Sequence, residues 1–130
     1  MGGFPAGCAH TIVVGGKSKG RQADVSHAAY NAFLAATRTI KPMNTNQQVT
    51  AKIQEVCTEF EVEPLQGVLS HKTKLHLNDG NEVIINKETP DQRVEDWEFA
   101  PGDVLQLDVY ATTGDGMARK AEARCTVFKR

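Results

Sequence analysis

The chain is poor in cysteine and in aromatic residues, and its charges nearly cancel. Its 130 residues include three cysteines, all far apart and without a Cys-x-x-Cys pair. This spacing argues against a disulfide framework and against a structural zinc site. With 15 basic and 16 acidic residues the net charge is -1, far from that of a polybasic nucleic-acid-binding chain. Any contact with nucleic acid would therefore need a local basic patch.

Long apolar runs are also missing. No stretch approaches the roughly 18 apolar residues that cross a membrane, and residues 1–5 lack the charged and apolar regions of a signal peptide. Unpaired cysteines are typical of a reducing compartment. We therefore expect no membrane partner and a location in the cytoplasm and nucleus. The length predicts one domain, residues 1–130, with a single core that buries roughly two-thirds of the unfolded surface.

Two of the four histidines lie in the stretch 67–76, which invites a metal or general-base interpretation. Their spacing argues against a shared ion. On a strand His71 and His76 would point to opposite faces, and on a helix they would lie about 140° apart. We expect one of them in a pocket and the other in solvent. Cys8 and His10 would share one face of a strand, but two ligands do not make a metal site.

Two helices are predicted between short strands. A β-branched run at 9–14 predicts a strand whose abrupt start indicates a cut through a larger fold. Asp24 then offers an N-cap or first-turn acid to a first helix. The buried stripe of that helix is predicted as Val25, Ala29, Ala32, Ala36 and Ile40. Thr45 and Asn46 offer caps to a second helix. Its buried stripe is predicted as Val49, Ile53, Val56 and Phe60, with Cys57 beside it.

The second half of the chain predicts antiparallel strands. A turn signal at 78–81 lies between 75–77 and 83–85, which predicts a hairpin. Residues 86–98 are polar and acidic and predict a loop that buries Trp97. Residues 104–111 predict a strand with Asp108 in its middle, a turn follows at 112–116, and 124–128 predict a returning strand. Because a buried, unpaired carboxylate is costly, Asp108 is either a hydrogen-bonded structural residue or part of a site.

Basic residues form two small groups that offer local positive charge. Lys17, Lys19 and Arg21 lie in a Gly/Ser-containing loop, and Lys72 and Lys74 follow later, with 119–120 as a further basic pair. A phosphate-contacting loop would have this composition. A solvated face would have it too, because charged runs on a surface are common.

Taken together, these elements and several short motifs resemble one family. The resemblance is to the pita-bread family of methionine aminopeptidases, and more closely to its proliferation-associated branch of ErbB-receptor-binding and curved-DNA-binding proteins. It runs from about residue 4 to the end, and it would make this chain an internal piece of a longer protein with both flanks missing. The motifs that carry it are Ala9-His10-Thr11, residues 20–25, Lys41-Pro42, residues 67–71, Lys74-Leu75-His76, Asp108, residues 113–116 and residues 128–130.

The resemblance implies an α+β fold, an antiparallel sheet with two helices packed on one face, and it locates the family's active-site positions. Of the family's metal ligands, the second aspartate corresponds to Gly7, the histidine to Val68 and the first glutamate to Asp108. The substrate-contacting histidine corresponds to His76. The first aspartate would precede residue 1, and the last glutamate would follow residue 130. Gly7 and Val68 cannot bind a metal, so the resemblance implies no cofactor and a loss of metal catalysis.

The chain is therefore expected to be a non-catalytic interaction module. The resemblance implies binding to RNA or the ribosome, with DNA and protein partners as further expectations, in growth and ribosome-related regulation. The alternative is a metal-dependent, methionine aminopeptidase-like hydrolase that missing segments complete. A third interpretation is a structural half without separate activity, which exposes an apolar face and forms a homodimer.

Overall fold

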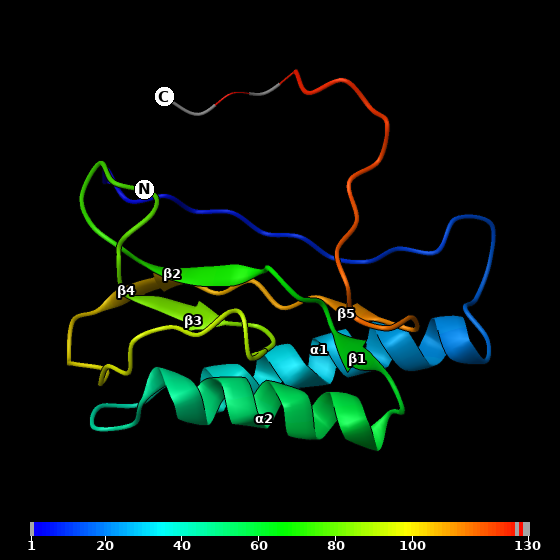
Figure 1. Ribbon diagram of the computed structural model, residues 1–130, viewed down its shortest axis with the longest axis horizontal. Helices are drawn as coiled ribbons and strands as arrows, with labels where there is room; N and C mark the ends of the chain where they lie inside the picture. Colours follow the sequence, from blue (N-terminus) through cyan, green and yellow to red (C-terminus); the bar gives the residue numbers. More distant parts are fainter. Residues whose placement is uncertain (1, 127, 129–130) are drawn as a thin grey trace.

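The fold is a layer of two helices under a layer of short antiparallel strands (Figure 1). The computed structural model describes residues 2–126 and residue 128. The elements in chain order are α1 (Arg21–Thr39), α2 (Asn46–Glu59), β1 (Glu63–Pro64), β2 (Leu69–Thr73), β3 (Val83–Ile85), β4 (Val104–Gln106) and β5 (Ala111–Thr112). The predicted α+β class, with both helices on one face of antiparallel strands, is confirmed. No helix of the described residues has the length and apolar character needed to span a membrane.

Helix α1 packs through a stripe of alanines. Ala28, Ala32 and Ala36 are fully buried, whereas Ala29, which we predicted for this stripe, is half-buried. Ala28 is buried instead of Ala29 because the face toward α2 consists of positions four apart, which are 28, 32 and 36. Their small side chains allow α1 and α2 to approach closely. The N-cap is Gly20, with φ 54° and no side-chain cap, so Asp24 is a first-turn acid and not the cap.

Helix α2 begins at the predicted cap. Thr45 accepts a hydrogen bond from the Gln48 N–H, and the Gln48 side chain accepts one from the Thr45 N–H, which completes a capping box. Cys57 is fully buried in the core, as predicted. Burial, and to a smaller extent the charge of Glu63, raises the pKa of its thiol to about 11. Cys57 is therefore a packing residue with an unreactive thiol.

The strands form two antiparallel groups. The larger has the order β3-β2-β4, and the smaller is the pair of β1 and β5. The predicted hairpin exists, but its first strand is β2 and not 75–77. The reason is a tight turn in which the main chains of Lys74 and Leu77 bond to each other, with His76 at φ 60°. The predicted strand 104–111 is interrupted between β4 and β5, where Asp108 bonds to a side chain instead of a neighbouring strand.

The two ends of the chain lie outside the sheet. Residues 9–14 are not a strand, which corrects our prediction. Ile12 and Val14 are 78% and 95% exposed, because no described strand lies beside this segment to pair with it. The predicted strand at 124–128 is also wrong for residues 124–126 and 128, while residue 127 lies outside the described residues. Figure 1 shows both segments on the side of the strands away from the helices.

Two buried asparagines hold the loops to this framework. The Asn46 amide donates to the carbonyls of Val83 and Glu95, and its oxygen accepts from the Trp97 N–H. The Trp97 indole also donates to Val83 O at 2.9 Å, so the loop 86–98 is anchored as predicted. Asn86 is 1% exposed and makes an equivalent set of bonds at the other end of the loop. Each side chain satisfies main-chain groups that would otherwise be buried without partners.

Candidate functional site

The four positions that the resemblance assigns to the family's active site differ in exposure and donor chemistry. Gly7 is exposed in the N-terminal segment, with open space where a Cβ would lie. Val68 is half-buried before β2, and its carbonyl accepts a hydrogen bond from the Asn86 N–H at 3.0 Å. His76 is exposed and Asp108 is half-buried. Two of the four positions therefore carry an ionisable side chain.

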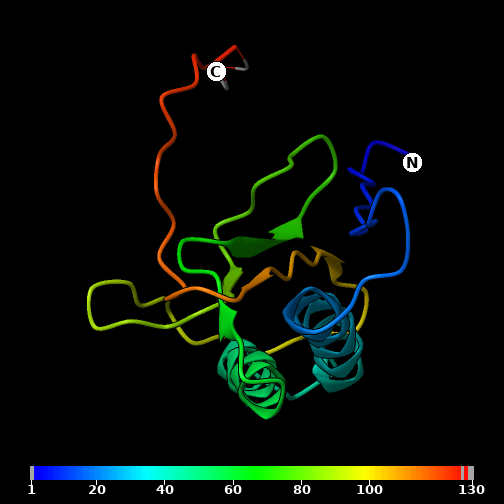
Figure 2. The same cartoon turned by 90° about the vertical axis from the view of Figure 1, so that its right-hand side faces the viewer.

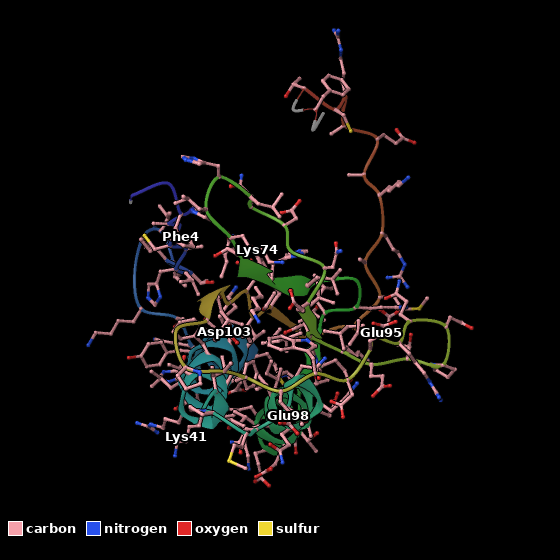
Figure 3. The ribbon with its side chains drawn as sticks, turned by 90° about the vertical axis from the view of Figure 1, so that its left-hand side faces the viewer. Phe4, Lys41, Lys74, Glu95, Glu98 and Asp103 are labelled. Carbon is pink, nitrogen blue, oxygen red and sulfur yellow. The ribbon has the colours of Figure 1, made fainter. Side chains whose placement is uncertain are left out.

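His76 lies in contact with the N-terminal segment. Its N–H donates to Gly3 O at 2.7 Å. Gly3 has φ 86°, a backbone conformation that favours glycine, and a Cβ there would also lie 2.8 Å from His76 Cε1, which would have to move aside. Figure 3 shows Phe4 and Lys74 on the same side of the molecule, where the segment meets this turn. No local pattern predicts this contact, because it joins residues more than 70 positions apart.

Asp108 lies beside two further polar side chains. Its main-chain N–H donates to Ser70 Oγ at 2.9 Å, and the Ser70 hydroxyl donates back to Asp108 O at 3.2 Å. The Asp108 carboxylate accepts a hydrogen bond from Gln106 Nε2 at 3.3 Å. Gln106 is the register partner of His71, so these two side chains share a face of the sheet. His71 Nδ1 lies 3.2 Å from Gly80 O. Gln106 was missed in the sequence analysis. Residues two positions apart on a strand lie on the same face, so the spacing of Gln106 and Asp108 could have predicted that they are neighbours.

This arrangement does not fit a two-metal centre. Such a centre needs a full set of carboxylate and imidazole donors. Gly7 and Val68 have no donor atoms in their side chains. Within the described part of the chain, no three His, Cys, Asp or Glu side chains form a group that could hold a metal. Cys8 and His10 are both exposed, and the His10 ring lies edge-on to Tyr30 with centroids 6.4 Å apart.

Lys72 belongs to a local ion-pair network. Its ammonium lies 2.9 Å from Asp103, 3.4 Å from Glu82 and 5.4 Å from the centre of the Trp97 ring. The Lys72 side chain is 19% exposed and that of Asp103 is 13% exposed. These contacts make Lys72 a structural cation that ties β2 to residues on either side of it. A phosphate that bound Lys72, as we predicted, would therefore have to compete with these two carboxylates.

The other predicted basic residues are divided between the two ends of the molecule. The Arg21 guanidinium donates to Glu61 O at 2.6 Å and to Phe60 O at 3.4 Å, and so binds the end of α2. Lys17, Lys19 and Lys74 are exposed. Figure 1 shows the start of α1 and the turn after β2 at opposite ends, so the five residues do not form one patch. The three exposed lysines stay candidates for phosphate contact.

Acid should remove the contribution of the Lys72–Asp103 pair. Partial burial raises the pKa of Asp103, but hydrogen bonds from the Ala100 N–H and from Lys72 outweigh it, so this pKa is lowered overall. A carboxylate with a lowered pKa stabilises the fold only while it is ionised. Asp103→Asn should therefore lower the urea midpoint at pH values above the ordinary carboxyl pKa of about 3.9. The difference from wild type should vanish as the pH falls through the lower pKa of the folded state.

The measurement is a series of urea unfolding curves between about pH 7 and pH 2.5. Asp91→Asn is the matched control, because Asp91 is exposed and has no ion pair with a described residue. A difference between Asp103→Asn and wild type that stayed constant over this range would show that the ionised pair does not contribute to stability.

Comparison with known proteins identifies the family of the chain. The model of metallopeptidase family M24 matches residues 1–123. The chain belongs to this family. Among M24 relatives, it is 36% identical over 132 residues to proliferation-associated protein A of Dictyostelium discoideum, an alignment that covers 98% of this chain and 34% of that protein. It is 38% identical over 130 residues to ERBB-3 binding protein 1 of Arabidopsis thaliana, with 98% and 33% covered. It is 34% identical to the curved DNA-binding protein of Schizosaccharomyces pombe, with 98% and 35% covered.

Solved structures agree with the M24 fold. A thermophilic Arx1 superposes with a TM-score of 0.72 at 19% identity, over 85% of this chain and 37% of that one. Methionine aminopeptidase from Rickettsia prowazekii superposes with a TM-score of 0.59 at 12% identity, over 70% and 35%. The predicted likeness to the pita-bread family and to its proliferation-associated branch is confirmed. The chain spans about a third of the length of the relatives that it matches.

Proposed function

We propose that this M24 chain is a non-catalytic interaction module whose main partner is RNA, free or within the ribosome, in the cytoplasm and nucleus. The observation that carries the non-catalytic part is the chemistry of two positions. Gly7 and Val68 stand where the family resemblance locates a metal-binding aspartate and histidine, and neither has a donor atom. Loss of two ligands from a two-metal centre removes the centre instead of tuning it.

Binding, as opposed to catalysis, is also what the names of the relatives describe. One is called a curved DNA-binding protein and another an ERBB-3 binding protein. The chain has exposed lysines at Lys17, Lys19 and Lys74 that can contact phosphates. A self-association of the chain is part of this proposal, since Leu75 and Leu77 are 55% and 47% exposed. DNA or protein partners and the completed hydrolase are the competing outcomes of the experiment.

The test combines a metal measurement with an RNA titration. The purified chain is equilibrated with cobalt and manganese, desalted and analysed for bound metal, and its mass is measured by light scattering. A structured RNA and a DNA duplex are titrated at several salt concentrations. We expect no stoichiometric metal, and RNA affinity that falls steeply with salt.

Two results would overturn the proposal. Stoichiometric metal together with release of N-terminal methionine from peptides, abolished by Asp108→Ala, would establish the hydrolase. Absence of salt-dependent binding to RNA would remove the nucleic-acid function. Asp91→Ala is the control for Asp108→Ala, because Asp91 is an exposed loop carboxylate without an ion pair to a described residue.

A further inference from the structure

A groove lies between two stretches of chain beside β3, the outer strand of the group β3-β2-β4. One wall is formed by residues 81–83, and the other by residues 94–97 of the loop that leads to β4. Its volume is about 300 Å³, at the lower end of the range for ligand pockets. Figure 2 shows the loop after β3 (yellow-green) projecting from the body of the molecule. Both walls come from the interior of the sequence, far from either end of the chain.

The two walls are held together by one buried side chain. Asn46, the first residue of α2, is 0% exposed. Its amide donates to Val83 O at 3.0 Å in one wall and to Glu95 O at 2.9 Å in the other. The Trp97 indole crosses the same gap and donates to Val83 O at 2.9 Å. The groove is therefore formed before a ligand arrives, and little free energy is lost in ordering it.

The groove combines apolar surface with two unpaired carboxylates. Val83, Val94 and Trp97 are half-buried and supply the apolar surface. Glu95 and Asp96 also line the groove, are exposed, and have no ion pair with a described residue. Arginine and lysine bury their aliphatic stems on apolar surface while the charged group stays in water. The groove therefore has the chemistry that such a side chain needs.

The cations that lie nearby are already paired with other acids. The Lys72 ammonium lies 3.4 Å from Glu82, a further groove residue, and 2.9 Å from Asp103. Arg93, which precedes the second wall, lies 3.9 Å from Glu88. Glu82 is therefore partly neutralised from within the chain. The charge that remains for a ligand is that of the two carboxylates in the second wall.

The field around the groove has the same sign. Residues 79–98 contain seven acidic and two basic residues. Figure 3 shows Glu95 well apart from Lys41 and Lys74, two exposed lysines on other parts of the surface. This local field attracts a cationic ligand and repels a polyanion. Charge complementarity thus selects a basic peptide over a nucleic acid.

We propose that the groove of residues 81–83 and 94–97 binds a basic segment of a protein partner. Aliphatic stems of arginine or lysine lie against Val83, Val94 and Trp97, and their charged groups lie beside Glu95 and Asp96. The site is separate from the exposed lysines of the proposed RNA contacts, because phosphates would meet its carboxylates. Either function can therefore fail without the other.

The first test uses Trp97, the only tryptophan of the chain, as the reporter. A short capped peptide that contains two arginines is titrated into the chain at low salt, and the emission of Trp97 and the heat of binding are recorded. We expect a saturable change in emission that weakens as the salt concentration rises, because salt screens the attraction. The same peptide with glutamine in place of arginine should leave the emission unchanged.

The second test removes the two carboxylates. Glu95→Gln/Asp96→Asn should lower the affinity for the arginine peptide about tenfold. Glu59→Gln/Asp91→Asn is the matched control, since it removes the same two residue types from exposed positions outside the groove. The control should change the affinity by less than about twofold. Because all four side chains are exposed, both variants should unfold at the same urea concentration as the wild type.

The third test addresses the apolar wall. Val94→Thr exchanges a methyl group for a hydroxyl group in the groove and leaves the charges unchanged. The affinity for the arginine peptide should fall about threefold, with the same dependence on salt. Val104→Thr is the control, because Val104 is 38% exposed on β4, which lies on the other side of β2.

The outcomes distinguish this inference from the proposed RNA binding. A chain that binds RNA but shows no change of Trp97 emission with the arginine peptide overturns the groove alone. A chain that binds the peptide but no RNA overturns the RNA function alone. Equal weakening by Glu95→Gln/Asp96→Asn and its control would mean that overall charge attracts the peptide, and would overturn the site.

Discussion

Replacing Gly80 with alanine should destabilise the protein by about 3 kcal/mol or more, a value at the upper end for overpacked positions. A Cβ at residue 80 would clash with the Lys72 carbonyl oxygen and would lie 3.1 Å from the Lys72 carbonyl carbon. Backbone atoms cannot rotate away as the end of a side chain can. The Lys72 peptide is also held in the hairpin, where its N–H donates to Glu82 O at 2.9 Å. Relief of the clash therefore requires β2 and the returning chain to separate.

Urea unfolding of Gly80→Ala at neutral pH measures the loss in the free energy of unfolding. The near-ultraviolet circular dichroism of Trp97 reports on the hairpin, because the indole bonds to Val83 O. Gly114→Ala is the control, because its new Cβ would meet only the Thr112 hydroxyl at an ordinary 3.5 Å. We expect the control to lie within about 0.5 kcal/mol of wild type. If Gly80→Ala were as stable as Gly114→Ala, the close approach of residues 72 and 80 would not exist in solution.

The helices were predictable because their signals are local. The capping residues Thr45 and Gln48 lie three positions apart, and the apolar stripe of α2 repeats every three or four residues. For α1 we predicted that Ala29 is buried, whereas Ala28 is the buried residue. Neighbouring alanines have the same side chain, so the sequence does not determine which of them faces the core. Alanine gives little hydrophobic contrast, so the facing helix decides which alanine is buried.

The strands were predicted less well because their pairing depends on distant residues. The run 9–14 has strong β propensity, but propensity cannot supply a neighbouring strand. In the run 104–111, the Ser70 hydroxyl takes both main-chain bonds of Asp108 and ends the strand early. Ser70 lies 38 positions away, and nothing around Asp108 in the sequence announces it.

In the candidate site, too, local properties were predictable from the sequence and long-range contacts were not. The residue types at Gly7 and Val68 could be read directly, since the absence of a donor atom is a property of the residue alone. The partners of Lys72 could not, because Glu82 and Asp103 reach it from two different parts of the chain. Its ion pairs give Lys72 a structural role, and the phosphate contact stays a prediction. Exposed and paired lysines look identical in a sequence.

Replacing Asn86 with alanine should have the second large effect, a loss of about 3 kcal/mol in the free energy of unfolding. The Asn86 amide donates to Leu65 O at 2.9 Å and to Tyr110 O at 2.8 Å, and its oxygen accepts from the Tyr110 N–H at 3.4 Å. Leu65 follows β1, Tyr110 precedes β5 and Asn86 follows β3. One buried side chain thus connects the two groups of strands. Its removal leaves buried main-chain groups without partners.

Urea unfolding of Asn86→Ala tests this connection, with Asn78→Ala as the control because Asn78 is exposed in the turn region. The Asn86→Asp variant refines the test, since a carboxylate can accept from the Tyr110 N–H but cannot donate to the two carbonyls. We expect Asn86→Asp to be at least as unstable as Asn86→Ala. If Asn86→Asp retained wild-type stability, the two donated bonds would contribute nothing. The pair of β1 and β5 would then be held by its own packing.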